Sequence, residues 1–143
     1  MAAVARIQEL LGGEPITGPL RSELDIVRMI RHGLPTEAVD HFLQVSRLSF
    51  NAIESHVLPR RTFMRRRQSA QPLDPVESDR FLRLVRLVAM ADETFGNSDK
   101  AMTWLGRENR VLDGQTPLSL ADTDQGARSV EALLGRIGHG LAA

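Results

Sequence analysis

The chain has 143 residues, 42% hydrophobic and 25% charged, a composition that excludes a disordered protein and allows one modest core or two small helical units. It contains no cysteine, which excludes disulfide bonds, thiolate zinc sites and a cysteine nucleophile. The formal net charge is zero, but residues 1–73 carry ten basic against seven acidic side chains and residues 74–143 eight against eleven, which indicates two different partners.

Nearly every segment has a helical pattern, because apolar residues recur at three and four positions and polar residues precede these runs. Strand alternation is scarce, so the predicted fold class is all-α. Ser22 is the predicted N-cap of a helix that continues through Ile30 and ends at Gly33. Its predicted inward face consists of Leu24, Val27 and Ile30.

Three further helices are predicted before residue 70. Thr36 is the expected cap of the first, whose inward residues are Ala38, Val39, Phe42 and Leu43. Ser49 is the expected cap of a short helix over residues 50–56, and Pro59 begins another helix that extends to about Gln68.

The last of these helices contains five arginines within eight consecutive residues, 60–67. Two short helices joined by a turn have the spacing of a helix-turn-helix, whose second helix enters the major groove of DNA. Leu58 and Phe63 are then expected to pack inward. The predicted DNA-binding residues are Ser49, Arg60, Arg61, Thr62, Met64, Arg65 and Arg66. The alternative is a basic exposed face without a specific ligand, and Val57 occupies the turn position where glycine is common.

Two prolines near residue 73 break the helical pattern and predict a boundary. Asp74 is the expected N-cap of a long helix, with Pro75 first and acidic residues in its first turn. Its predicted apolar stripe is Phe81, Leu84, Val85, Val88 and Phe95, and Arg80, Arg83 and Arg86 are expected on a solvated face. We therefore divide the chain into an arm (1–21), either flexible or dimerising, a helix-turn-helix-like region (22–73), and the long helix with a small helical domain (74–143).

The remaining segments are short helices and turns. Residues 96–98 end the long helix and begin one that carries Trp104, the only tryptophan, for which a core position is favoured over an interface position. Asp113-Gly114 predicts a tight turn, and Thr116-Pro117 predicts a cap. The inward residues of the final helix are expected to be Val130, Leu133, Leu134 and Ile137.

Several kinds of chemistry are excluded by what the sequence lacks. The four histidines show no metal-binding spacing, and no nucleophile elbow or phosphate loop occurs, so we expect no catalysis, no metal and no cofactor.

No apolar stretch approaches the roughly 20 residues of a membrane span. The amphipathic start, residues 1–11, lacks the apolar core of a signal peptide, so we expect a cytoplasmic protein without membrane contact.

The C-terminal part shares a long set of spaced residues with a known family. They are Ala91, Phe95-Gly96, Ala101, Trp104-Leu105, Asn109, Leu112, Gly114, Thr116-Pro117, Gly126, Val130, Leu133 to Ile137 and His139-Gly140. On these residues the chain resembles the toxin-binding domain of the Xre/MbcA/ParS antitoxins. Residues 61–66 and 77–80 also look like the Xre-like helix-turn-helix region of that family, and the resemblance covers roughly residues 48–143.

The resemblance implies an antitoxin that blocks a RES-domain, NAD-depleting toxin by covering its active site. The implied toxin-binding residues are Trp104, Leu133, Arg136, Ile137, His139, Gly140 and Leu141, followed by the terminal Ala142 and Ala143. It also implies a homodimer that represses its own operon, and a dimer suits a palindromic operator. The alternative is a stand-alone transcriptional regulator whose C-terminal domain dimerises or senses a ligand.

Overall fold

The computed structural model of the protein describes residues 2–140, and within them every regular element is a helix, as the sequence predicts. The α-helices are α1 (Ala2–Leu10), α2 (Glu14–Thr17), α3 (Glu23–His32), α4 (Thr36–Ser46), α5 (Asn51–Glu54), α6 (Arg60–Gln68), α7 (Pro75–Phe95), α8 (Ser98–Leu105) and α9 (Asp124–Gly138). Two 3-10 helices, η1 (Arg110–Leu112) and η2 (Leu118–Asp122), lie between α8 and α9.

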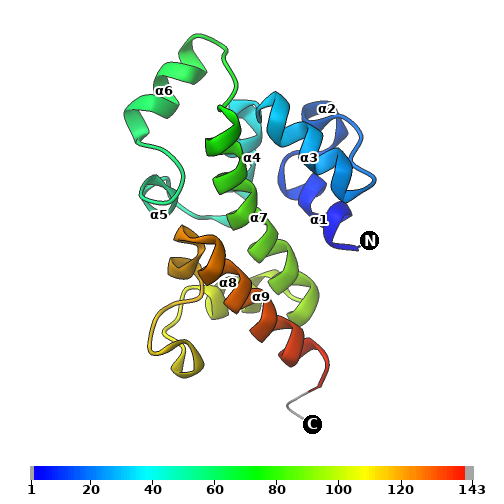
Figure 1. The fold of residues 1–143 in the computed structure, drawn as a ribbon, viewed down its shortest axis with the longest axis vertical. Coiled ribbons are helices and arrows are strands. Elements are labelled where there is room, and N and C mark those ends of the chain that lie inside the picture. The colour runs from blue at the N-terminus through cyan, green and yellow to red at the C-terminus, as the bar shows by residue number, and fades with distance from the viewer. Residues whose placement is uncertain (1, 141–143) are drawn as a thin grey trace.

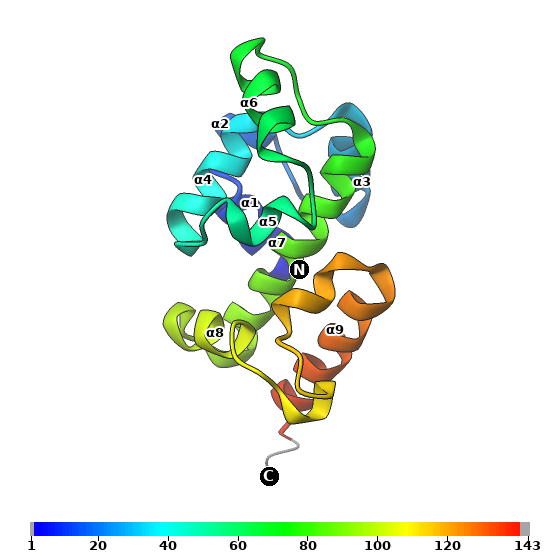
Figure 2. The same cartoon turned by 90° about the vertical axis from the view of Figure 1, so that its left-hand side faces the viewer.

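Helix α7 joins two groups of helices, which we name the N-terminal lobe (residues 2–72) and the C-terminal lobe (residues 98–140) (Figures 1 and 2). Its 21 residues span about 32 Å, and it packs against α1, α3, α8 and α9. Four of the five residues of the predicted stripe are buried and Phe95 is half-buried. Leu82, Leu87 and Ala89 are buried as well, because neighbouring helices cover α7 on several sides. The boundary at residue 73 stays a prediction, since α7 contacts both lobes.

Local hydrogen bonds begin α7 where the sequence predicts. Asp74 Oδ1 accepts from the Glu77 N–H at 2.7 Å, and Glu77 Oε1 accepts from the Asp74 N–H at 2.9 Å. Pro75 occupies the first helical position. Ser22 caps α3, because its hydroxyl oxygen accepts a hydrogen bond from the Asp25 N–H at 3.3 Å. These two predicted starts are confirmed.

Two other predicted caps are wrong. Thr36 is the first residue of α4 and is 6% exposed, and Pro35 stands at the N-cap without a side-chain hydrogen bond. Ser49 does not cap the next helix either, because α5 begins at Asn51 with Phe50 at its N-cap. The α5 helix is shorter than predicted. At the start of α5 packing replaces capping, because Phe50 is 8% exposed and its ring contacts Phe63.

The buried face of α3 differs from the predicted one. Leu24 and Val27 are 62% and 36% exposed, whereas Ile26 and Met29 are buried. Ile30, as expected, is partly buried against the core. Because apolar residues lie on two sides of this helix, their spacing alone could not select the side that meets α7.

The N-terminal residues pack into the core instead of forming a free arm. Val4, Ile7, Leu10 and Leu11 are at most 2% exposed. The Arg6 guanidinium also reaches α7, where its Nη2 and Nε lie 2.8 and 2.9 Å from one carboxylate oxygen of Asp92. Helix α1 therefore belongs to the folded unit.

The arginines of α7 do not form a simple solvated face. Arg80 is exposed, but Arg86 donates two hydrogen bonds to Glu23 of α3, at 2.7 and 3.1 Å. This partner holds the pKa of Glu23 below its ordinary value and raises that of Arg86. Arg83 Nη1 donates to the Ala121 carbonyl at 3.4 Å and thereby links α7 to η2. The expectation of a solvated face is thus wrong for two of the three arginines.

Candidate functional site

Helix α6 stands at the end of the molecule opposite the last described C-terminal residues (Figure 1). Phe63 is its buried side chain, 1% exposed, and packs on Phe50 with ring centroids 5.1 Å apart. Leu58 is 2% exposed, so both residues predicted to point inward do so. Most of the remaining surface of α6 faces solvent.

The connection between α5 and α6 forms without glycine. Val57 has no left-handed backbone conformation, which is where glycine would be favoured, and its side chain is 2% exposed. Residue 57 therefore contributes to the core. The departure from the common turn pattern has a packing explanation and leaves the two-helix arrangement intact.

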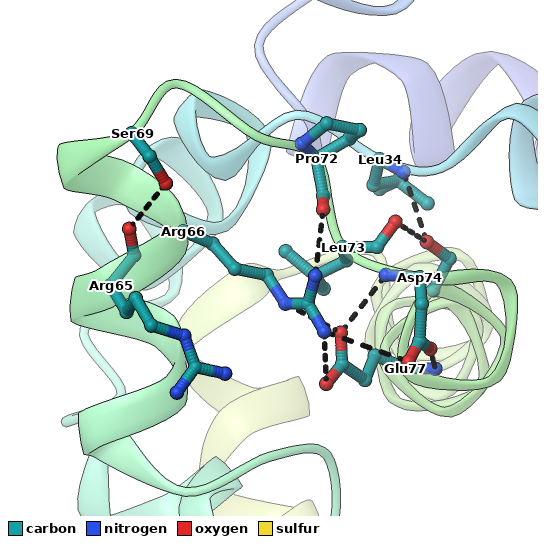
Figure 3. A network of polar contacts seen from close by, with 9 residues as sticks. Leu34, Arg65, Arg66, Ser69, Pro72, Leu73, Asp74 and Glu77 are labelled. Atoms are coloured by element: carbon teal, nitrogen blue, oxygen red, sulfur yellow. Dashed lines mark hydrogen bonds and ion pairs between the residues drawn. The ribbon is translucent and has the colours of Figure 1, made fainter.

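Two of the five arginines have free guanidinium groups. Arg61 and Arg65 are exposed, and their side chains make no hydrogen bond or ion pair with the residues that the structure describes. Their spacing of four places them on one face of α6. Met64, 48% exposed, lies next to this face, and Figure 3 shows the Arg65 guanidinium separate from the contacts of its neighbour.

Arg66 points toward the start of α7 (Figure 3). Its side chain is 20% exposed, with Nε 3.0 Å from Glu77 Oε1 and Nη2 3.2 Å from Glu77 Oε2. Asp74 Oδ2 lies 3.6 Å from Nη2, and the Pro72 carbonyl accepts from Nη1 at 3.5 Å. Arg66 thus joins α6 to the same two carboxylates that cap α7, a placement that supports a structural role.

Arg60 and Arg67 have intramolecular partners but remain exposed. Arg60 Nη2 donates to Asn51 Oδ1 at 3.0 Å, and its guanidinium lies 4.9 Å from the Phe50 ring centre. Arg67 pairs with Asp40 of α4 and lies 4.9 Å above the Phe63 ring. The sequence analysis did not single out Asn51 or Asp40, because neither is close to its arginine along the chain.

The other two predicted DNA-binding residues differ in exposure. Ser49 is exposed in the segment before α5, and its carbonyl accepts the Ala52 N–H at 3.0 Å. Thr62 is half-buried on α6. Thr62 follows Arg61 directly on α6, whereas Ser49 lies outside this helix, so α6 carries every predicted DNA-binding residue except Ser49.

The end of α9 forms the second candidate site. Val130 and Leu134 are fully buried and Leu133 is 7% exposed. Farther along, Ile137 is half-buried, and the remaining described residues, 138–140, are exposed. The exposed predicted residues are Arg136, His139 and Gly140. Leu141, Ala142 and Ala143 lie outside the described residues.

Trp104 occupies an intermediate position. Its ring packs against Phe95 with a centroid distance of 5.6 Å and against the edge of the core. Trp104 and Phe95 also line a hollow of about 310 Å³, together with Lys100 and Arg107. The residue therefore combines the core contact and the surface access that the sequence analysis treated as alternatives.

No cluster of three or more potential metal ligands occurs between residues 2 and 140. None of the helices in that range is long and apolar enough to cross a membrane.

Two family models match consecutive parts of the chain. The antitoxin Xre-like helix-turn-helix domain matches residues 25–86, which include α6 and the first half of α7. The antitoxin Xre/MbcA/ParS C-terminal toxin-binding domain matches residues 90–140, which include α8 and α9. Each candidate site lies within one of the two matches.

Three curated proteins, each named antitoxin Xre, are similar to this chain. The Yersinia enterocolitica protein is 32% identical over 118 residues, 81% of this chain and 80% of that protein. The Photorhabdus laumondii protein is 35% identical over 115 residues, 79% and 78% of the two chains. The Pseudomonas putida protein is 38% identical over 84 residues, 59% of this chain, and the match spans about half of its own length, 53%.

Proposed function

This chain belongs to the Xre family of antitoxins, and from that premise we propose that it neutralises a RES-domain, NAD-depleting toxin by covering the toxin's active site with the end of α9. We further infer that it forms a homodimer, binds operator DNA through α6 and represses its own operon. On this proposal the chain binds its partners and catalyses no reaction.

The toxin proposal rests on the exposure of the C-terminal end of α9, a helix whose preceding turns pack into the core. Val130 and Leu134 hold the helix in the core with 0% exposure, while Arg136 and His139 project from its last turns into solvent. A recognition element that is already ordered loses little conformational entropy on binding. The end of α9 can therefore enter a concave site as a preformed helix.

Co-expression with the RES-domain protein expected from a neighbouring gene tests this proposal. The wild-type chain should restore growth and cellular NAD, and the double variant Arg136→Glu/His139→Glu should not, although it remains folded. Arg128→Glu is the matched control, because Arg128 is an exposed residue near the other end of α9. Rescue by the double variant equal to wild type would contradict the role of the α9 end.

The DNA proposal is supported by how the arginines differ in their contacts. Arg61 and Arg65, which have free guanidinium groups, can bind guanine edges or phosphates. Arg60, held by Asn51 and Phe50, is oriented for a phosphate contact. Met64 offers an apolar surface to a thymine methyl group. We assign Arg66 to support of α6 on account of its contacts with Glu77.

The stand-alone regulator remains the competing function. It predicts operator binding without any effect on a RES-domain toxin. Gene neighbourhood gives a first discrimination, since a lone gene favours the regulator. The co-expression experiment decides between them, because a regulator would leave NAD depletion unchanged.

A further inference from the structure

A groove of about 490 Å³ lies between the C-terminal halves of α7 and α9, beside the start of α1. Its lining from α7 includes Met90, Glu93 and Thr94. Residues of α9 form the other wall, among them Glu131, Gly135 and Gly138. His139 lies at one end, so the groove is continuous with the proposed toxin-binding end of α9.

The fold does not explain the glycine at position 135. It lies inside α9 with ordinary helical backbone, and a Cβ atom there would meet no atom of residues 2–140 within 4 Å. Glycine lowers the stability of a helix relative to alanine, so alanine would suit the isolated chain better. Gly126 of the same helix is different, because a Cβ there would collide with the Leu120 carbonyl. Packing thus requires Gly126, whereas Gly135 only leaves the groove open.

The two carboxylates of the groove, Glu93 and Glu131, differ in their surroundings. Neither Glu93 nor Glu131 makes an ion pair within 4 Å among residues 2–140. Arg86, which also lines the groove, already has Glu23 as its partner at 2.7 and 3.1 Å. The hydrogen-bonded carboxylate partners of Arg86 and Arg128 raise the pKa of these groups most, and Glu131 lies close enough to raise both further. Glu93 is therefore the carboxylate that favours a cationic occupant.

We propose that this groove binds a lysine- or arginine-bearing segment of the toxin, as a second contact beside the end of α9. The segment approaches α9 at Gly135, where the absence of a side chain allows close packing, and its cationic group lies beside Glu93. Two observations favour the toxin as the occupant: the Glu93 carboxylate, which has no ion pair among residues 2–140, and the continuity with His139. This inference rests on the proposed function.

The test measures binding of the full-length chain to the purified RES-domain protein. Gly135→Leu should weaken binding by about tenfold, or about 1.4 kcal/mol, while its melting temperature stays at or above that of wild type. Gly135→Ala should have a smaller effect in the same direction. Ala132→Leu is the matched control, since Ala132 is exposed on α9 and does not line the groove. Its affinity should equal that of wild type.

Charge reversal tests the nature of the occupant. Glu93→Lys should weaken binding by about tenfold at low salt and by less at high salt, because screening reduces the contribution of exposed charges. Glu108→Lys, an exposed reversal outside the groove, should leave the affinity unchanged.

The outcomes separate this inference from the proposed function. If the wild-type chain fails to bind the RES-domain protein, the proposed function fails, and the groove proposal with it. If wild type binds and Gly135→Leu and Glu93→Lys bind equally well, only the groove proposal is overturned. A third outcome is a groove variant that changes the oligomeric state of the antitoxin in the absence of toxin, without changing toxin affinity. That result would assign the groove to a second copy of this chain and would also overturn the groove proposal.

Discussion

The two ends of this molecule present their binding groups in different ways. The α6 end has many charged groups, and several of them have partners within the molecule. Arg66 and Arg67 are paired with carboxylates, while Arg61 and Arg65 have no partner among residues 2–140. At the α9 end charges are few, and a helix with interior glycine leaves space beside itself. A cluster of arginines in the sequence therefore predicts a larger binding surface than the fold leaves available. A glycine, which has no side chain, can contribute to a surface that the sequence does not predict.

The largest expected effect tests whether α6 depends on one buried residue. Phe63→Ala should lower the free energy of unfolding by about 3–5 kcal/mol, because the ring is 1% exposed and packs on Phe50. Denaturant unfolding followed by circular dichroism gives this value. Met64→Ala, at a neighbouring exposed position, should change it little. Equal effects of the two variants would mean that α6 is held mainly by its polar contacts.

The second prediction separates free from paired arginines. Arg61→Ala/Arg65→Ala should weaken operator binding and reduce the slope of log affinity against log salt by about one unit for each lost phosphate contact. Stability should stay unchanged, since both side chains are exposed and unpaired within the described residues. Titration of operator DNA at several salt concentrations measures this effect.

Arg66→Ala is the contrasting variant for that experiment. It should lower stability by about 1–3 kcal/mol, because the Glu77 carboxylate beside it is 12% exposed and would lose its charged partner. An Arg66→Ala protein of wild-type stability but reduced salt dependence would show that Arg66 contacts DNA after all.

The third prediction compares two glycines on α9. Gly135→Ala should raise the free energy of unfolding by about 1 kcal/mol, the difference in helix propensity between the two residues. Gly126→Ala should lower stability instead, since its Cβ would collide with the Leu120 carbonyl. Thermal unfolding of both variants checks the opposite signs. Destabilisation by Gly135→Ala would mean that the fold itself needs this glycine.

The smallest expected effect concerns pH. The hydrogen bond from Arg86 holds the pKa of Glu23 below its ordinary value of 4.5 in the folded chain. The pair therefore stabilises the fold fully above that value, and its contribution is lost as pH falls through the lower folded pKa. Because Glu23 is 58% exposed, we expect only a few tenths of a kcal/mol. The stability difference between wild type and Glu23→Gln, measured at neutral and at strongly acidic pH, should shrink in acid.

Much of the candidate site could be predicted because the relevant signals are short-range or repeated. The arginine cluster and the inward Phe63 followed from residues within nine positions of each other. Which arginines remain free did not follow, since Asp40 and Glu77 approach α6 from two other helices. The Gly135 groove was not recognised either, because a glycine in a helix has the same appearance in the sequence whether packing requires it or not.

By itself the sequence determined the helical class and several helix starts, including the Asp74 capping box and the Ser22 cap, because these depend on hydrogen bonds within four residues. Only the tertiary structure decided that α3 buries Ile26 and Met29 rather than Leu24 and Val27. Periodicity sets the spacing of apolar residues on a helix, but where two faces carry them, the neighbouring helices select the one that is buried.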